Sequence, residues 1–429
     1  MYILFTLDRS SCGKPIFKGD TFCDDENNNE GCDWDGGDCC GDIVKTSCST
    51  CQYQCLDPNF YYGALNSNWQ LKDLNHIKSV VMDFMAKYNV EGSSLALVKD
   101  GRLVYSQGFG VMEKTLNKPV QATSLFRIAS LSKPITSAVL MMMIEENLIK
   151  LESKIFGQNG VLGTDYGTQP YSDYEKQITL QHLLEHTAGG LSWANNNFDP
   201  YDPMFQHLWD YDFSKLIGWV LDTRDPSVQP GTDYAYSNFG YCVLGRVIEK
   251  ISGQSYESYV QQKILNPIGA TLTKIGKSKI SEKVKYEVTY YDNNSPYYPN
   301  LNVERMDAHG GWISSSVDLA RFLVHFDGLS SKPDLISRST YDLMVTPSSQ
   351  NDHYAKGWSV NSLHNIWHTG SLPGTGSMFF SSPSKGICAV FLMNYRWKDD
   401  IDPMLWDIIN GIEKWPSNLD LFSSHIIDT

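Results

Sequence analysis

The 429-residue sequence predicts an α/β (α+β) fold in which helices flank an antiparallel sheet, with a mostly helical subdomain and a small disulfide-rich module in front. Eight of the ten cysteines lie between Cys12 and Cys55. Strand-like alternation occurs near both ends of the remaining chain, and helical apolar spacing dominates between them. We therefore expect a cysteine-rich module over 1–57, a large domain over 68–415 and a C-terminal tail over 416–429.

Composition and charge exclude some classes of function. The formal net charge is −14, and no block of lysine and arginine occurs. Nucleic acid is therefore not an expected partner, because phosphate binding needs a basic surface. No apolar stretch reaches the length of a bilayer span, so no transmembrane segment is expected. The first residues carry a short apolar burst without the basic flank of a signal peptide, which fits a signal remnant or a truncated start.

The cysteine-rich module is strongly acidic. Residues 19–40 contain eight acidic side chains and three asparagines, too polar to form a core. A hard cation such as Ca²⁺ would neutralise these carboxylates, and a solvated acidic loop is the alternative. The pairs Cys48/Cys51 and Cys39/Cys40 would also suit a cytosolic zinc module. The absence of histidine from this segment favours disulfides in an oxidising compartment, and hence a secreted protein.

The large domain begins with a helix and a hairpin. Residues 71–88 have the apolar spacing of an amphipathic helix. Residues 92–110 contain two alternating runs joined by Lys99-Asp100-Gly101, a typical hairpin turn.

Helices then alternate with loops until a second hairpin. Helical spacing recurs after Pro134 and over 179–187 and 242–253, a second hairpin is expected over 377–394, and a closing helix over 402–415. Strands at both ends of the domain predict one antiparallel sheet built from both ends, with the helices inserted between them.

One long segment, residues 192–213, is rich in Trp, Tyr, Asp and Pro. Such a loop suits a position beside a functional cleft, and a well-packed surface excursion fits equally well.

The stretch RIASLSKPIT, residues 127–136, places a Ser-x-x-Lys pair at the start of an apolar helix. Ser130 and Lys133 are three residues apart and project from one helix face. Pro134 is tolerated there because the first helical turn needs no N–H at that position. The positive end of the helix stabilises a developing anion, and a desolvated lysine can accept the hydroxyl proton. The pair predicts a nucleophile, Ser130, and its base, Lys133; the alternative is a helix cap beside a solvated lysine.

Two further motifs strengthen this interpretation. Tyr236-Ser237-Asn238 precedes an apolar helix, where the phenol can carry a proton and the amide can hold a substrate carbonyl. His368-Thr369-Gly370 precedes the final hairpin, and its glycine lets a substrate backbone approach a strand edge. Similar patterns at 382–385, 291–293 and 298–300 lie in turns, and His309-Gly310-Gly311 is interpreted as a structural turn.

These three motifs, in this order, resemble the serine β-lactamase and penicillin-binding family. The Tyr-x-Asn form resembles class C β-lactamases, D-Ala-D-Ala carboxypeptidases, D-aminopeptidases and related esterases. FRIASLSKPIT, TLQHLLEHTAGGL, YSNFGYCVLGRVIEKISG and GGWISSSVDLARF extend the resemblance over most of 68–415. It implies a β-lactamase/transpeptidase-like fold, a small-molecule or peptide substrate and no cofactor for catalysis.

Residue roles follow from the resemblance. Ser130 would form an acyl-enzyme, Lys133 and Tyr236 would relay its proton, and Asn238 would hold the substrate amide. The backbone N–H groups of Ser130 and Ser371 would form the oxyanion hole, and Thr369 and Gly370 would line the substrate site.

His368 departs from the class C pattern, which has lysine at this position. The resemblance therefore implies that a permanent cation for a substrate carboxylate is replaced by a titratable one. We accordingly expect a peptidase or esterase rather than an efficient β-lactamase.

The acidic module resembles the cysteine-rich repeat of Notch receptors and pappalysins, through GD-x-x-C and C-x-WDGGDC. That resemblance implies a Ca²⁺ site and a surface for a protein partner. Its ligands would be Asp20, Asp35, Asp38 and the Phe22 carbonyl, and its disulfides Cys12–Cys32 and Cys23–Cys39. Cys40, Cys48, Cys51 and Cys55 then allow three connectivities.

Two functions remain from the sequence. The first is a secreted serine hydrolase acting on D-amino-acid peptides, esters or β-lactams. The alternative is a non-catalytic scaffold in which the fold is kept and the cysteine-rich module does the binding.

Overall fold

The computed structural model describes residues 69–116, 118–194, 202–207, 209–292, 295–296, 301–396 and 398–423. The whole cysteine-rich module lies outside the described residues. Its predicted Ca²⁺ ligands and disulfides therefore stay predictions (Asp20, Phe22, Asp35 and Asp38; Cys12, Cys23, Cys32, Cys39, Cys40, Cys48, Cys51 and Cys55).

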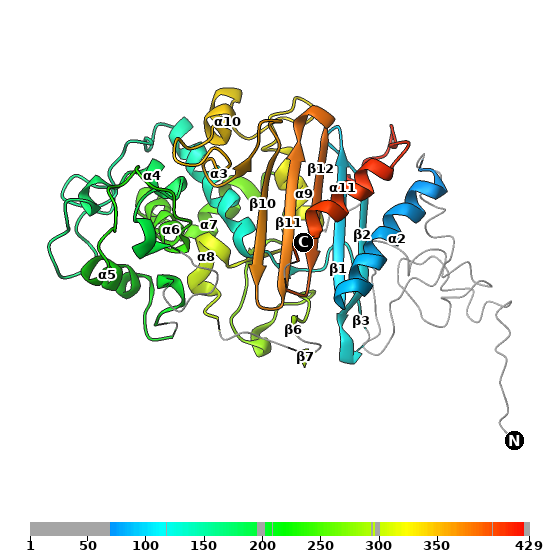
Figure 1. The fold of residues 1–429 in the computed structure, drawn as a ribbon, viewed down its shortest axis with the longest axis horizontal. Coiled ribbons are helices and arrows are strands. Elements are labelled where there is room, and N and C mark those ends of the chain that lie inside the picture. Colours follow the sequence, from blue (N-terminus) through cyan, green and yellow to red (C-terminus); the bar gives the residue numbers. More distant parts are fainter. Residues whose placement is uncertain are drawn as a thin grey trace, which may run out of the picture.

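The large domain is built on an antiparallel sheet that joins the two ends of the described chain (Figure 1). Its strand order is β3-β2-β1-β12-β11-β10-β9. β1 pairs with β12 in a register that places Leu95 opposite Phe391. The predicted α/β fold, with one antiparallel sheet made from both ends, is confirmed. The strands are β1 (Gly92–Lys99), β2 (Arg102–Glu113), β3 (Lys118–Pro119), β9 (Ser359–Val360), β10 (Ile366–Leu372), β11 (Thr375–Ser382) and β12 (Ile387–Met393).

The first hairpin forms where the sequence predicts it. Asp100 and Gly101 both have positive φ, 50° and 73°, which a two-residue turn between twisted strands requires. The turn therefore sets the register of β1 against β2.

Helices cover both faces of the sheet. α2 (Leu71–Tyr88) and α11 (Ile401–Gly411) lie together on one face, where Phe84 packs edge-on against Phe391 of β12 (Figure 1). On the opposite face, α9 (Ser316–Val324) packs against β1 and β12. Both sides of the central strands are therefore buried, and all seven residues of β12 are buried.

The helical subdomain lies beyond β10, at the left of Figure 1, and surrounds α3 (Ser132–Glu145). α3 is apolar nearly all round, as expected for a core helix. The other helices are α4 (Leu180–Leu184), α5 (Phe213–Thr223), α6 (Asn238–Ser252), α7 (Tyr256–Val260), α8 (Asp307–Gly310) and α10 (Arg338–Val345). Short strands complete the domain: β4 (Phe126–Arg127), β5 (Lys274–Ile275) and β8 (Trp312–Ser314) form one sheet, and β6 (Tyr291–Asp292) pairs with β7 (Ser295–Pro296).

The sequence predicted a C-terminal tail over 416–429, and the structure describes this segment as far as residue 423. Phe422 is buried, with the Arg321 guanidinium and the Lys332 ammonium over its ring. The Leu103 N–H of β2 donates to the Asp420 carboxylate at 3.2 Å. The folded domain therefore includes this segment, because an aromatic ring and a capping carboxylate fix it to the sheet.

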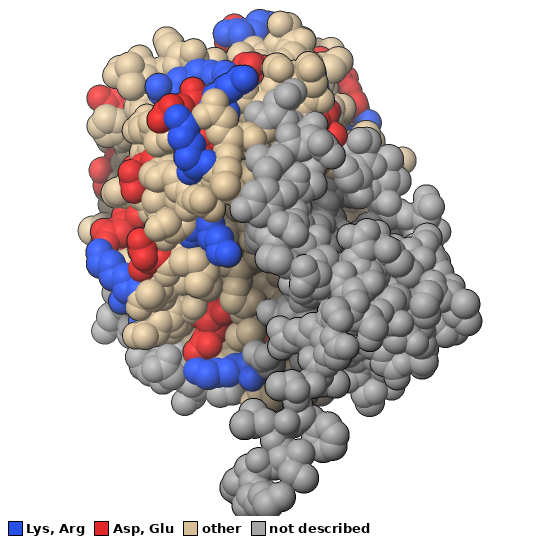
Figure 2. All heavy atoms as spheres, turned by 90° about the vertical axis from the view of Figure 1, so that its right-hand side faces the viewer, with Lys and Arg blue, Asp and Glu red and all other residues tan. Residues whose placement is uncertain are grey.

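Charges of both signs are mixed on the described part of the face that carries α2 (Figure 2). They form no single-sign patch there. Within the described residues, no helix is long and apolar enough to span a bilayer.

Candidate active site

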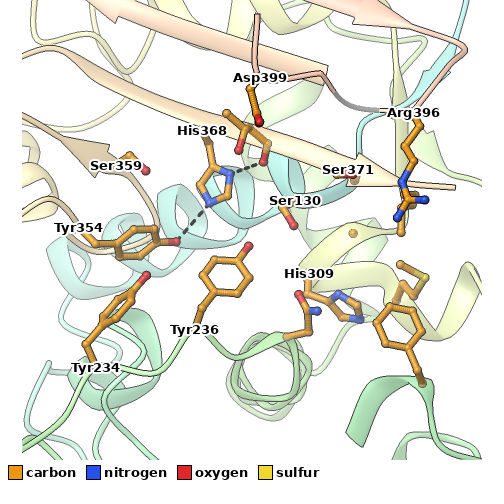
Figure 3. Close-up of a pocket in the computed structure, with 17 residues that line it drawn as sticks. Ser130, Tyr234, Tyr236, His309, Tyr354, Ser359, His368, Ser371, Arg396 and Asp399 are labelled. Carbon is orange, nitrogen blue, oxygen red and sulfur yellow. Dashed lines mark hydrogen bonds between the residues drawn. The ribbon is translucent and has the colours of Figure 1, made fainter. Parts of the chain in front are cut away.

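A cavity of about 600 Å³ opens between the helical subdomain and the β10 edge of the sheet. Its lining brings together residues far apart in the sequence, including Ser130, Tyr236, Asn238 and His368 (Figure 3). The predicted substrate-site residues Thr369 and Ser371 line it as well.

Ser130 lies in the 3₁₀ turn Ala129–Leu131 (η6), which leads directly into α3. Ala129 before it has φ of 50°, a left-handed conformation that is rare without glycine. The Ser132 hydroxyl donates to the Ala129 carbonyl at 2.7 Å and closes the turn. Ser130 is thereby held at the start of the helix, facing the cavity.

Lys133 is fully buried, and its side-chain nitrogen has three oxygen neighbours. Lys133 Nζ lies 3.0 Å from Ser130 Oγ, 2.8 Å from Asn238 Oδ1 and 3.0 Å from the His309 carbonyl. Burial lowers the pKa of Lys133 well below its usual value of 10.5. A neutral amine beside the serine can accept its proton.

Tyr236 directs its hydroxyl toward Ser130 (Figure 3). Its ring lies 4.7 Å from Lys133 Nζ and 6.3 Å from the His368 ring. Burial raises the pKa of Tyr236 above its usual value of 10. The resting residue is therefore a neutral phenol, able to pass a proton on but not to start as a phenolate.

Asn238 begins α6 and is held from both sides of its amide. Its oxygen accepts from Lys133, and its nitrogen donates to Asp202 Oδ2 at 3.0 Å. Asp202 is buried, and burial raises its pKa to about 6. This carboxylate orients the amide and adds negative potential near Lys133. Asp202 belongs to the segment 192–213, so the described part of that segment contributes to the site.

His368 is buried on β10, and its two ring nitrogens both have partners. Nδ1 lies 2.7 Å from the Thr369 carbonyl, and Nε2 lies 3.3 Å from the Tyr354 hydroxyl. Burial and the nearby Lys133 lower the pKa of His368 to about 3. This shift favours the neutral imidazole, whereas the sequence predicted a titratable cation at this position, and that expectation stays a prediction.

The β10 edge supplies the remaining predicted residues. Among the described residues, β9 pairs with β10 only at Ile366 and Trp367, so the rest of this edge faces η6. A Cβ on Gly370 would lie 2.4 Å from the Ile128 carbonyl and 3.1 Å from the Ala129 Cβ. Only glycine therefore allows β10 to come this close to the serine turn.

Several residues that line the cavity or support its lining were missed by sequence reasoning. His309 was interpreted as part of a turn, but it lies in α8, is buried, and gives its carbonyl to Lys133. Asp202, Tyr354 and Tyr234 carry no local pattern that marks them as functional. His186 stood within a stretch that the resemblance covered, TLQHLLEHTAGGL, without an assigned role.

The alternative motif at 382–385 lies outside this arrangement. Ser382 ends β11 and Lys385 is exposed in the turn that follows, and neither lines the cavity.

Relatives share this architecture. Penicillin-binding protein 4* of Bacillus subtilis is 26% identical over 74% of this chain and 71% of its own length. Further relatives from Staphylococcus aureus align over 74% of this chain, which spans 62% of their length. A class C β-lactamase structure matches with a TM-score of 0.64 at 18% identity, covering 80% of this chain and 97% of that one. EstCE1, a hydrolase with promiscuous acyltransferase activity, matches with a TM-score of 0.62 at 17% identity, covering 82% and 100%.

The sequence profile of the family described as Beta-lactamase matches residues 77–409, which include the sheet, the helical subdomain and every residue of the cavity. The chain belongs to this β-lactamase family of serine hydrolases.

Proposed function

We propose that the chain is a hydrolase that forms an acyl-enzyme on Ser130 and cleaves ester or amide bonds, with D-amino-acid peptides, esters and β-lactams as the substrate classes. The observation that supports this most strongly is the 3.0 Å contact between Ser130 Oγ and Lys133 Nζ. A buried amine with a lowered pKa, next to a hydroxyl that faces a cavity, is the arrangement of an activated nucleophile.

Acylation begins with proton transfer from Ser130 Oγ to Lys133 Nζ as the oxygen bonds to the substrate carbonyl carbon. The carbonyl oxygen becomes an oxyanion, which the backbone N–H groups of Ser130 and Ser371 stabilise. Each such donor is worth about 3 kcal/mol in acyl-transfer enzymes. Asn238 keeps its oxygen on the new ammonium, and Asp202 offsets part of its charge.

Collapse of the tetrahedral intermediate breaks the bond to the leaving group. The Tyr236 phenol gives its proton to the leaving oxygen or nitrogen and takes the proton that Lys133 holds, so both side chains return to their resting states. In deacylation, water attacks the ester of Ser130, its proton passes through the same pair, and Ser130 Oγ recovers a proton.

The similar proteins support acyl transfer as the class of reaction, and they do not identify the acyl group of the substrate. The names of the similar proteins span a penicillin-binding protein, a class C β-lactamase and a hydrolase with acyltransferase activity. Attack of Ser130 on a carbonyl would suit each of these three classes of activity.

A variant series tests the proposal. Hydrolysis of 4-nitrophenyl esters, nitrocefin and a D-Ala-D-Ala peptide is measured for the wild type, Ser130→Ala and Lys133→Ala. Ser382→Ala, which removes the serine of the other Ser-x-x-Lys motif, is the matched control. We expect Ser130→Ala and Lys133→Ala to lose activity on at least one substrate, and Ser382→Ala to retain it. A folded wild type without turnover of any substrate would instead favour the non-catalytic scaffold.

We also propose that the protein is secreted and that the module over 1–57 binds Ca²⁺ through Asp20, Asp35, Asp38 and the Phe22 carbonyl. The support is its density of cysteines and carboxylates. Thermal unfolding of the non-reduced full-length chain in Ca²⁺ and in chelator tests the metal site. A module transition that shifts up with Ca²⁺, and no longer does so in Asp35→Ala, is expected; an unchanged transition would contradict it.

A further inference from the structure

A chain of hydrogen bonds runs behind the cavity from α6 to β10. It begins at the Ser237 backbone N–H, which lies 3.0 Å from His186 Nδ1. A backbone N–H can only donate, so His186 Nδ1 must be unprotonated. The proton of the neutral His186 ring is therefore on Nε2, which lies 3.1 Å from the Tyr354 hydroxyl.

The other end of the chain is fixed in the same way. The Thr369 carbonyl can only accept, so His368 Nδ1, at 2.7 Å, must carry the proton. A neutral His368 then has a bare Nε2, 3.3 Å from the same Tyr354 hydroxyl. Figure 3 shows Tyr354 and His368 joined in this way at the rear of the cavity.

Tyr354 connects the two ends because a phenol accepts one hydrogen bond and donates another. It can accept from His186 Nε2–H and donate to His368 Nε2. The Tyr241 hydroxyl, which donates to the Leu184 carbonyl, is a further partner of Tyr354. A second proton on His368 would direct two N–H groups at the same phenol oxygen and would turn the phenol proton away from His368, towards the Tyr241 oxygen. The hydrogen-bond pattern thus disfavours the imidazolium, apart from any effect of burial.

Among the described residues, no carboxylate is a cause of the shift in the His368 pKa; Asp399, the carboxylate in the same cavity lining, is exposed. Burial is the main cause that keeps His368 neutral, and Lys133 would oppose protonation of His368 further whenever Lys133 itself carries a proton. Its aromatic neighbours Tyr354 and Tyr236, and Tyr241 beside them, are phenols whose pKa values burial raises above 10. Asp202 lies behind Asn238 and acts on Lys133.

The electrostatic character of the cavity follows from these groups. Around Ser130 the titratable side chains rest as a neutral imidazole, neutral phenols and an amine with a lowered pKa. The exposed Arg396 and Asp399 lie at the lining with opposite charges. Arg396 is the permanent cation of the described lining, and it is exposed to solvent, whereas His368 beside Ser130 offers a substrate carboxylate no charge.

We propose that His186 and Tyr354 are positioning residues that hold His368 as a neutral imidazole of fixed tautomer, so that the site selects uncharged acyl donors over those bearing a carboxylate. This inference rests on the proposed function, and narrows its substrates to neutral esters and amides. Tyr354 and His186 act through His368 and take no part in bond making.

The test compares two esters that differ in charge at the end of the acyl chain, 4-nitrophenyl valerate and mono-4-nitrophenyl glutarate. We expect kcat/KM of the wild type to be about tenfold or more higher for the neutral ester. Tyr354→Phe removes the phenol proton and allows His368 to be protonated. The preference of the Tyr354→Phe variant for the neutral ester should fall as the pH is lowered from about 8 to 5, while the preference of the wild type stays constant. Tyr259→Phe, on α7 outside the cavity, is the matched control and should behave as the wild type.

A second measurement is independent of the Tyr354 variant. NMR of histidine-labelled wild type, with His368→Gln for assignment, should find His368 in the Nδ1–H tautomer without titration between about pH 5 and 8. A His368 resonance that titrates in this range, the Nε2–H tautomer, or equal kcat/KM for the two esters would overturn the inference. Labelling of Ser130 by a fluorophosphonate on the same samples distinguishes failure of this inference from failure of the proposed function. A wild type that is not labelled at Ser130 would contradict the proposed function, whereas a labelled one that fails the tests above would contradict only the inference.

Discussion

At the residue scale, the position of Ser130 depends on a backbone conformation that most side chains avoid. Ala129 has φ of 50°, and a left-handed residue with a Cβ costs about 1–2 kcal/mol. The surrounding packing must hold this conformation, because η6 lies between β10 and α3. Strain of this kind is often found beside reactive groups.

Ala129 yields the first prediction. Ala129→Gly should change the free energy of unfolding by less than about 1 kcal/mol, because relief of strain and added freedom of the unfolded chain oppose each other. Ala129→Val should destabilise by more than about 2 kcal/mol, because a β-branched residue at positive φ is strongly disfavoured. Urea denaturation measures both. Equal effects of the two substitutions would contradict the role assigned to the backbone.

Asp202 yields the second prediction, on stability. Its pKa is raised by burial from 3.8 to about 6, so the folded state binds a proton that the unfolded state has already lost. The stability that this bound proton contributes to the free energy of unfolding is full below about pH 4, and it is lost as the pH rises through about 6. Asp202→Asn should therefore gain about 2 kcal/mol relative to wild type between pH 4.5 and pH 8. Urea denaturation at the two pH values checks this, and a pH-independent difference would contradict it.

The same substitution gives the third prediction, on activity. The Asp202 carboxylate raises the pKa of Lys133, and removing it favours the neutral amine. The acidic limb of kcat/KM should shift to lower pH in Asp202→Asn, with a lower maximum because Asn238 loses its charged acceptor. An unshifted limb would exclude electrostatic coupling between these residues. Asp222→Asn, at a half-buried carboxylate of α5 far from Lys133 in the sequence and outside the cavity lining, is the control and should leave the limb in place.

At the element scale, the site depends on how closely β10 approaches η6. Sequence reasoning placed Gly370 at a strand edge, and the close contacts to Ile128 and Ala129 give the physical reason for glycine. A methyl group there would push the strand away from the serine turn, and with it the backbone of Ser371.

The fourth prediction concerns this approach. Gly370→Ala should lower kcat/KM by about 10²-fold or more, the size expected when an oxyanion donor is displaced. A neighbouring substitution on the same strand, Ser371→Ala, keeps the backbone N–H and should retain much more activity. Similar losses in both variants would argue against a steric role for Gly370.

Other features at this scale were beyond sequence reasoning. The hairpin at Asp100-Gly101 and helix α2 follow from local periodicity and turn chemistry, so they could be predicted. β4, β5 and β9 contain two residues each and carry no periodic signal. Tyr354 lies in the segment between α10 and β9, and only long-range packing brings it to His368. Local pattern identifies nucleophile motifs, whereas their supporting side chains depend on tertiary contacts.

At the scale of the whole molecule, the sheet closes the domain by joining β1 to β12, and the last described residues fasten to the same sheet. Phe422 fills a buried position between Arg321 and Lys332. The sequence placed this segment in a tail, since a lone aromatic residue after several polar ones gives no pattern.

The fifth prediction tests this attachment. Phe422→Ala should lower the free energy of unfolding by about 3 kcal/mol, in the range for a buried aromatic residue. Leu363→Ala, at an exposed leucine, should change it by less than about 0.5 kcal/mol. Thermal and urea unfolding of both variants measure the difference. A Phe422 variant as stable as the wild type would mean that the domain ends earlier.

The central claim is that one alcohol, Ser130, becomes acylated because Lys133 removes its proton. Intact-mass analysis after brief exposure to a reactive ester, followed by peptide mapping, tests it most directly. The account predicts a single added acyl group on the peptide that contains Ser130, absent in Ser130→Ala and strongly slowed in Lys133→Ala. An acyl group on another residue, or equal acylation of Lys133→Ala and the wild type, would contradict it.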